Sequence, residues 1–231
     1  MVAKMLADHG VSVVVPDLWG HGRSAGHRGD VRLDQAADEL ARWVHEVLLP
    51  SSQHAHGYVL FGHSAGGLLA IDWAIRYPER VRRMIVQAPL LDLGYVIPRW
   101  KHALARTLAW CAPSCGLSTG LTPAFLSHDQ AVVQAYTADS LVHRRITARA
   151  SRALFRLMRM VRSRPAELHV PTLVLYGAED RVVSTHAIAE WFRQLPGEKR
   201  SVIFPNCYHE LHHESVRERV LSLIADWANH P

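Results

Sequence analysis

The chain has 231 residues, of which 48% are hydrophobic and 20% charged, with a formal net charge of +5 at pH 7; this balance is ordinary for a globular protein. No apolar stretch approaches a membrane span in length, and the first ten residues lack the long apolar core of a secretory signal. Three cysteines, Cys111, Cys115 and Cys207, argue against a disulfide framework and favour a reducing cytoplasm, so we expect Cys111 and Cys115 to be buried as small hydrophobes.

The first fifty residues predict a helix, a strand and a second helix. Residues 2–9 read as the end of a helix that Gly10 closes. Residues 11–15 form an apolar, β-branched run that predicts a buried strand, and a polar, glycine-rich loop follows it. Apolar side chains then recur at helical spacing over residues 33–47, and Pro50 with the two serines after it should end that helix.

Strands and helices continue to alternate on both sides of a central segment. The expected strands are short apolar runs at residues 58–61, 84–87, 172–176 and 201–204. The expected helices lie after the first, third and fourth of these strands, and Ser215 with Glu218 predicts a capping box for the last helix. This alternation predicts an α/β fold with a mostly parallel sheet and helices on both faces.

Residues 90–166 interrupt the alternation. Three helical patterns occur there, the longest over residues 146–161, and no strand is evident. We therefore expect a core formed by residues 1–89 and 167–231, with 90–166 as a helical cap inserted over the sheet.

One motif organises the chain. Gly62-His63-Ser64-Ala65-Gly66 lies between the strand at 58–61 and the helix that follows, and it matches G-x-S-x-G. In this context a sharp turn holds the serine in a strained conformation and exposes its hydroxyl at the carboxyl end of the sheet. The motif predicts a nucleophilic serine at Ser64, although a glycine-rich structural turn is the plainer alternative.

A serine hydroxyl needs a base, usually a histidine that a buried carboxylate orients. Asp180 follows the strand at 172–176, and His209 follows the strand at 201–204. Parallel strands end at one edge of the sheet, so these side chains should approach Ser64 there. The order Ser64, Asp180, His209 is the order of a nucleophile-elbow hydrolase.

With these motifs, the chain resembles the α/β-hydrolases of the monoacylglycerol lipase and lysophospholipase-like group, also called serine aminopeptidase S33-like. The match extends over nearly the whole chain, through Pro16-Asp17, Gly20-His21-Gly22-Arg23-Ser24, the Ser64 motif, Gly177-Ala178-Glu179-Asp180 and Tyr208-His209-Glu210. The resemblance implies Ser64 as nucleophile, His209 as general base and then acid, and Asp180 as its orienting carboxylate. It also implies that the Ala65 backbone N–H donates to the oxyanion.

The match departs from the family at the amino end. The family has a His-Gly loop after an earlier strand, and this loop supplies a second oxyanion donor. That strand belongs between the runs at 11–15 and 58–61, and its sequence is missing here. Two readings follow: either the protein begins upstream of Met1, or the chain is a catalytically impaired, truncated member of the fold. Losing one oxyanion donor costs about 10²- to 10³-fold in rate.

A different chemistry is suggested by residues 209–213, His-Glu-Leu-His-His, which match H-E-x-x-H. In a zinc peptidase this motif lies on one helix, where two histidines bind zinc and the glutamate activates water. Here the segment follows a strand exit, so we expect a loop and regard a zinc peptidase as a remote alternative. His63 should pack beside the serine turn, whereas His54, His56, His212 and His213 are expected at the surface.

Arginines gather in the expected cap: Arg144, Arg145, Arg149, Arg152, Arg156, Arg159, Arg162 and Arg164 lie in one stretch without an acid. The helix at 146–161 can rest on anionic lipid through its apolar face, or it can pack that face on the body and leave its arginines in solvent. No motif supports binding to nucleic acid.

We therefore expect a cytoplasmic serine hydrolase that cleaves carboxylic esters through an acyl-serine intermediate, without cofactor or metal. The lipid-type substrate, a monoacylglycerol or lysophospholipid, and a peripheral contact of the cap with membranes follow from the resemblance and from the cap's charge.

Overall fold

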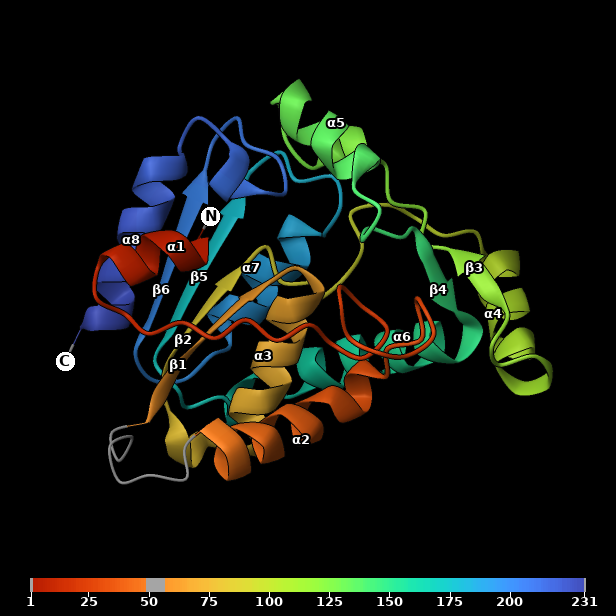
Figure 1. Cartoon of the computed structure of the whole chain (residues 1–231), viewed down its shortest axis with the longest axis horizontal. Coiled ribbons are helices and arrows are strands. Elements are labelled where there is room, and N and C mark those ends of the chain that lie inside the picture. The colour runs from red at the N-terminus through yellow and green to blue at the C-terminus, as the bar shows by residue number, and fades with distance from the viewer. Residues whose placement is uncertain (1, 49–56, 231) are drawn as a thin grey trace.

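A computed structural model describes residues 2–48 and 57–230 of the chain. Its centre is a four-stranded parallel sheet in the order β1-β2-β5-β6, visible in Figure 1. The strands are β1 (Tyr58–His63), β2 (Val81–Gln87), β5 (Thr172–Gly177) and β6 (Lys199–Phe204). All four were predicted from their apolar runs. Register pairs His63 with Gln87 and Gln87 with Leu175, so the strands end together at one edge.

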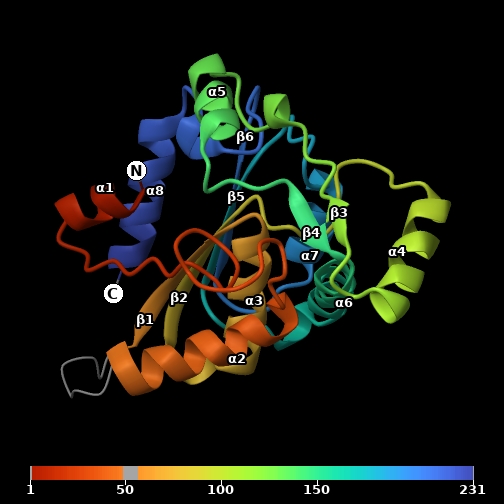
Figure 2. The same cartoon turned by 45° about the vertical axis from the view of Figure 1, so that its right-hand side comes forward.

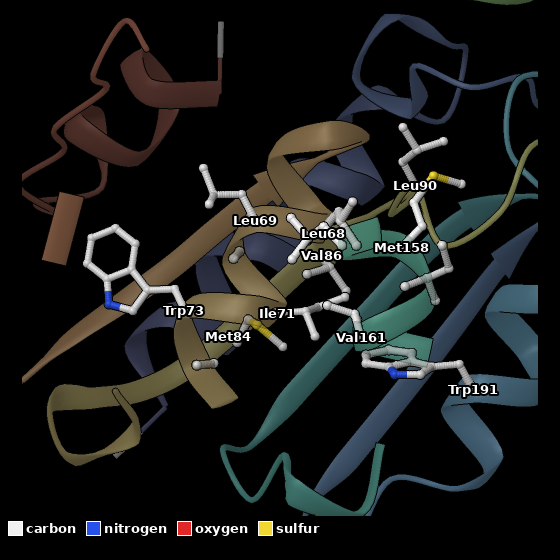
Figure 3. Packing of buried hydrophobic residues seen from close by; sticks show 14 of the residues in the cluster. Leu68, Leu69, Ile71, Trp73, Met84, Val86, Leu90, Met158, Val161 and Trp191 are labelled. Atoms are coloured by element: carbon white, nitrogen blue, oxygen red, sulfur yellow. The ribbon is translucent and has the colours of Figure 1, made fainter. Parts of the chain in front are cut away.

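Helices cover both faces of the sheet. Successive side chains of a strand point to opposite sides, so the apolar strands present side chains to both layers of helices. Met84 and Val86 of β2 pack under α3 (Ala65–Arg76) and α6 (Ala148–Ser163), as Figure 3 shows. Ile85 belongs instead to the core on the other face, which α8 (Arg217–Asn229) and α1 (Val2–Asp8) cover. The predicted α/β architecture with helices on both faces is confirmed.

The remaining helices also follow the predicted pattern. They are α2 (Leu33–Trp43), which continues as a π-helical turn (Val44–Leu48), α4 (Arg99–Cys111), α5 (Gln130–Ala138) and α7 (Thr185–Arg193). Gly10 closes α1 with a φ of +78°, a conformation that glycine adopts without strain. The predicted end of α2 at Pro50 and the serines after it lies outside the described residues, as do His54 and His56.

The predicted strand at residues 11–15 is wrong. This segment has no regular structure, and Val14 and Val15 are 54% and 73% exposed. A strand is held by a neighbour that shares its backbone hydrogen bonds. In the part of the chain that the structure describes, the sheet ends at β1, and no segment occupies the position between β1 and residues 11–15. For the same reason β1 is a half-buried edge strand and not the fully buried strand expected.

Residues 90–166 hold α4, α5 and α6, but also a small two-stranded antiparallel sheet that was not predicted. It pairs β3 (Gly116–Ser118) with β4 (Arg145–Thr147). Three residues per strand are too few to show the alternation by which strands are identified. In Figure 2, α4 lies on the outside of the molecule beyond α6. The division into a core and a cap inserted at 90–166 stays a prediction.

Two smaller expectations are also wrong. Cys111 and Cys115 are exposed, because α4 ends at Cys111 and buries none of its residues. The capping box at Ser215 and Glu218 does not form, since α8 begins at Arg217 after Val216 and no side chain caps it.

None of the helices among residues 2–48 and 57–230 is long and apolar enough to cross a bilayer.

Candidate active site

Ser64 occupies the sharp turn between β1 and α3 with φ 54° and ψ −119°, a conformation that non-glycine residues rarely adopt. Backbone hydrogen bonds hold it there. The Ser64 N–H donates to the Gln87 carbonyl at 3.0 Å, and the Ser64 carbonyl accepts from the N–H groups of Leu68 at 3.1 Å and Leu90 at 3.0 Å. This is the strained geometry that the G-x-S-x-G motif predicts.

Two glycines of this turn are required by close packing. A Cβ on Gly62 would lie 2.4 Å from the Gly66 carbonyl oxygen, and one on Gly67 would lie 3.1 Å from Pro89. A Cβ on Gly66 would meet nothing within 4 Å, so packing does not require a glycine there. Ala65 is the first residue of α3, and N–H groups of a first helical turn have no partner within the helix. Its N–H is therefore available to an oxyanion.

Asp180 and His209 form a buried pair. The His209 Nδ1–H donates to Asp180 Oδ2 at 2.7 Å, and the two side chains are 3% and 0% exposed. The other carboxylate oxygen, Oδ1, accepts from the backbone N–H groups of Val182 at 2.8 Å and Val183 at 3.0 Å. Each side chain follows its strand, β5 or β6, so the pair lies at the sheet edge where β1 ends at the serine turn.

The pair reaches the serine turn through His63, the residue before Ser64. The ring of His63 lies 4.6 Å from that of His209, measured between centroids. Burial, followed by the neighbouring His209 and His212, holds the pKa of His63 well below its usual value. A neutral ring beside His209 adds no charge that would oppose an imidazolium there. The predicted position of His63 beside the turn is confirmed.

The geometry thus gathers the predicted site residues at one sheet edge, and comparison with known proteins gives the family. A family model described as serine aminopeptidase, S33, matches residues 1–216. The chain belongs to this family.

Relatives of this S33 hydrolase agree in sequence and in fold. The chain is 28% identical to a monoacylglycerol lipase of Mycolicibacterium smegmatis over 98% of the chain and 81% of the relative. It is 29% identical to phospholipase YtpA of Bacillus subtilis, over 94% and 84%. A crystal structure of a Paleococcus ferrophilus monoacylglycerol lipase superposes with a TM-score of 0.90 at 28% identity, covering 98% of the chain and 86% of that protein. These findings confirm the predicted α/β-hydrolase fold and the prediction of a carboxylic ester hydrolase.

Coverage of relatives is not uniform. The chain spans 24% of an uncharacterized abhydrolase domain-containing protein of Dictyostelium discoideum, to which it is 25% identical over 230 residues.

Sequence reasoning missed a polar network behind the site of this S33 hydrolase. Gln87, fully buried at the end of β2, places its amide Nε2 2.8 Å from His212 Nδ1 and 3.2 Å from His63 Nδ1. The ring of His212 stands 5.3 Å from that of His63, measured between centroids. His212 is half-buried, and burial lowers its pKa to about 4. His212 and His213 are therefore not the surface residues that the sequence suggested.

A second missed feature braces the loop that carries His209. The buried Glu214 carboxylate accepts from the backbone N–H of His128 at 3.0 Å and from that of Tyr208 at 3.3 Å. The His128 ring also stacks on Tyr208, with centroids 3.7 Å apart. Leu126 accepts a further bond from the Glu210 N–H at 2.8 Å. Residues 126–128 of the predicted cap thus fix the His209 loop, which nothing in the local sequence indicates.

The zinc-peptidase geometry is not formed. His209 is engaged by Asp180, and the residues after it form a 3₁₀ turn at Leu211–His213 and not the continuous α-helix that H-E-x-x-H needs. His213 Nδ1 lies instead 2.7 Å from Glu210 Oε2.

Proposed function

We propose that this S33 hydrolase cleaves carboxylic esters of lipid type, a monoacylglycerol or a lysophospholipid, through an acyl-serine intermediate. The observation that carries the proposal is the buried Asp180–His209 pair at the sheet edge where Ser64 occupies a strained turn. The lipid class is supported by the names of the relatives, which are a monoacylglycerol lipase and a phospholipase.

In this mechanism Ser64 Oγ attacks the ester carbonyl carbon while His209 Nε2 takes the hydroxyl proton. The Ala65 N–H stabilises the negative charge on the carbonyl oxygen of the tetrahedral intermediate. Its collapse breaks the ester C–O bond, and the proton on His209 passes to the leaving alcohol. Water, deprotonated by His209, then attacks the acyl-serine; the bond to Ser64 Oγ breaks, the proton on His209 returns to that oxygen, and the acid is released. Asp180 holds Nδ1–H throughout, so Nε2 stays free to accept a proton.

The test is covalent labelling with a fluorophosphonate, read by intact mass. We expect one adduct on the wild-type chain and none on Ser64→Ala, while Ser222→Ala, an exposed serine of α8, should label like wild type. Chain that has not been treated with the probe should hydrolyse monoacylglycerol or lysophospholipid dispersions at a rate that Ser64→Ala, or prior labelling of the wild type, abolishes. An unlabelled wild-type chain, folded by circular dichroism, would instead support the catalytically impaired alternative.

Contact with membranes is the second part of the proposal, and we assign it to α4 in place of α6. The apolar face of α6, including Leu157, Met158 and Val161, is buried in the main core. By contrast α4 buries none of its residues and exposes Trp100 by 64% and Trp110 by 85%. Exposed indole rings of this kind favour the lipid–water interface.

A cleft of about 590 Å³ lies between α4 and α6. It combines cationic and apolar side chains: His102, Ala105, Arg106, Ser151, Arg152, Phe155 and Arg159. This cationic lining matches the phosphate of an anionic lipid headgroup. We expect sedimentation with anionic vesicles to exceed that with zwitterionic ones, and Trp110→Ser to reduce both. Equal sedimentation of Trp110→Ser and wild type would contradict the contact at α4. A cytoplasmic location stays a prediction.

A further inference from the structure

Three side chains with metal-binding atoms lie directly after His209. They are Glu210, His212 and His213, and one ligand atom of each can be chosen so that all three atoms lie within 4.8 Å of one another. All three residues are half-buried, so they sit at the edge of the site and not on an open surface. This set differs from the H-E-x-x-H set. In a zinc peptidase the two histidine ligands would be His209 and His213, whereas here they are His212 and His213.

The two imidazoles are already oriented through their Nδ1 atoms. His213 Nδ1 lies 2.7 Å from Glu210 Oε2, and His212 Nδ1 lies 2.8 Å from the Gln87 amide. His213 would bind a metal through Nδ1, because an ion that replaces the proton shared by Nδ1 and Glu210 Oε2 contacts both atoms. A histidine whose Nδ1–H is held by an oxygen instead presents an unprotonated Nε2 to a metal. The Gln87 Oε1 atom is buried without a hydrogen-bond partner. Turning that amide over would let Oε1 accept from His212 Nδ1–H, which frees Nε2 of His212 for the ion.

The donor set suits zinc. Two imidazoles and a carboxylate are ligands that Zn²⁺ binds readily, with water in the fourth position of a tetrahedron. Binding requires neutral imidazoles.

An ion at this position would oppose catalysis. His209 becomes an imidazolium when it takes the proton of Ser64, and the rings of His212 and His209 both contact the ring of His63, at 5.3 and 4.6 Å between centroids. A dication beside His209 repels the positive charge that forms there. We infer that Glu210, His212 and His213 bind Zn²⁺ and that this ion inhibits ester hydrolysis by the neighbouring triad. The inhibitory part rests on the proposed function.

The experiment measures zinc binding and turnover separately. The exposed thiols of Cys111 and Cys115 can bind zinc themselves, so all chains carry both as serine. Isothermal titration with ZnCl₂ should give one site, which His213→Ala and Glu210→Gln each weaken by about a hundredfold. The control is His186→Ala, which removes an exposed His–Glu pair on α7, 3.4 Å from Glu190, and should bind zinc like the parent.

Ester hydrolysis is then followed over the same zinc concentrations and after removal of zinc with EDTA. We expect turnover to fall by at least about tenfold at saturation, to recover with EDTA, and to become insensitive to the same zinc concentrations in His213→Ala. The inference is overturned if the parent binds no zinc, if its affinity equals that of both His213→Ala and Glu210→Gln, or if saturation leaves turnover unchanged. A chain that binds zinc as expected but hydrolyses no ester, and takes no fluorophosphonate, would instead count against the proposed function.

Discussion

Replacing Asp180 by asparagine tests the proposed triad with almost no change in shape. The result depends on which atom of the new amide faces His209. Asp180 Oδ1 accepts two backbone N–H groups, from Val182 and Val183, at 2.8 and 3.0 Å. Only an oxygen can accept there, so the amide oxygen of the variant should occupy this position. The NH₂ group must then face His209 Nδ1, where Oδ2 lies in the wild type at 2.7 Å.

An NH₂ group donates, so Nδ1 of His209 must accept and the proton of the neutral ring moves to Nε2. That tautomer cannot take the Ser64 proton. In serine hydrolases with this arrangement the same change costs about 10⁴ in kcat, or about 5.5 kcal/mol of transition-state stabilisation. Because the hydrogen bonds of Val182 and Val183 survive, the loss should appear in kcat, with KM and the thermal midpoint little changed.

The assay is steady-state hydrolysis of a monoacylglycerol, with Asp226→Asn on α8 as the control for an exposed carboxylate. Asp226→Asn should match wild type, and Ser64→Ala sets the background. If Asp180→Asn kept more than a tenth of the wild-type kcat while folding normally, the assignment of Asp180 as the orienting carboxylate would be refuted.

Three further predictions concern stability and positioning. Arg149, whose side chain is 43% exposed, and the buried Thr147 both donate to the buried Asp30 carboxylate, and the Arg149 hydrogen bond lowers the Asp30 pKa. Asp30→Asn should therefore cost about 1–3 kcal/mol of unfolding free energy at pH 7, and the difference should vanish as pH falls from about 4 through the folded-state pKa, measured by urea denaturation. Gly62→Ala should lower the free energy of unfolding by about 1–3 kcal/mol. Gly66→Ala, whose Cβ meets nothing within 4 Å, should be neutral or stabilise the fold by up to about 1 kcal/mol. Equal urea midpoints for the two variants would contradict the packing at the turn. Glu214→Ala should displace the loop that carries His209 and so lower kcat about a hundredfold, with a smaller effect on KM. Glu214→Gln should partly restore kcat. A wild-type kcat in Glu214→Ala would rule out this positioning role.

The site could be anticipated from sequence because each of its residues directly follows an apolar strand. Ser64, Asp180 and His209 are far apart in the chain, yet parallel strands end at one edge of the sheet, which makes their meeting a consequence of topology. The Ser64 turn also has its own local signal, since its glycines relieve close backbone contacts. No comparable rule connects Gln87 to His212, which are 125 residues apart and meet only because β2 ends beside the His209 loop.

Predictions from the local sequence pattern were wrong where an element depends on the elements that it packs against. Residues 11–15 have the composition of a strand, but a strand needs a partner, and none lies beside them in the described chain. Cys111 shows the reverse case: it looks like a core residue in a helical pattern, but it is exposed and α4 buries none of its residues. Burial is set by what an element packs against, which periodicity alone does not state.

The segment from His209 to Glu214 shows why residue type alone could not assign roles. Its sequence holds three histidines and two glutamates. The H-E-x-x-H pattern would group His209, Glu210 and His213 as a zinc-peptidase site, which the structure does not form. Contacts from outside the segment separate them: Asp180 holds His209, and the N–H groups of His128 and Tyr208 hold Glu214. The side chains of the remaining three residues, Glu210, His212 and His213, are thereby left free of the catalytic pair and of the loop brace. Loss of Glu214 should therefore impair turnover without zinc, whereas loss of Glu210 should remove the response to zinc, so the two glutamates are separable by experiment.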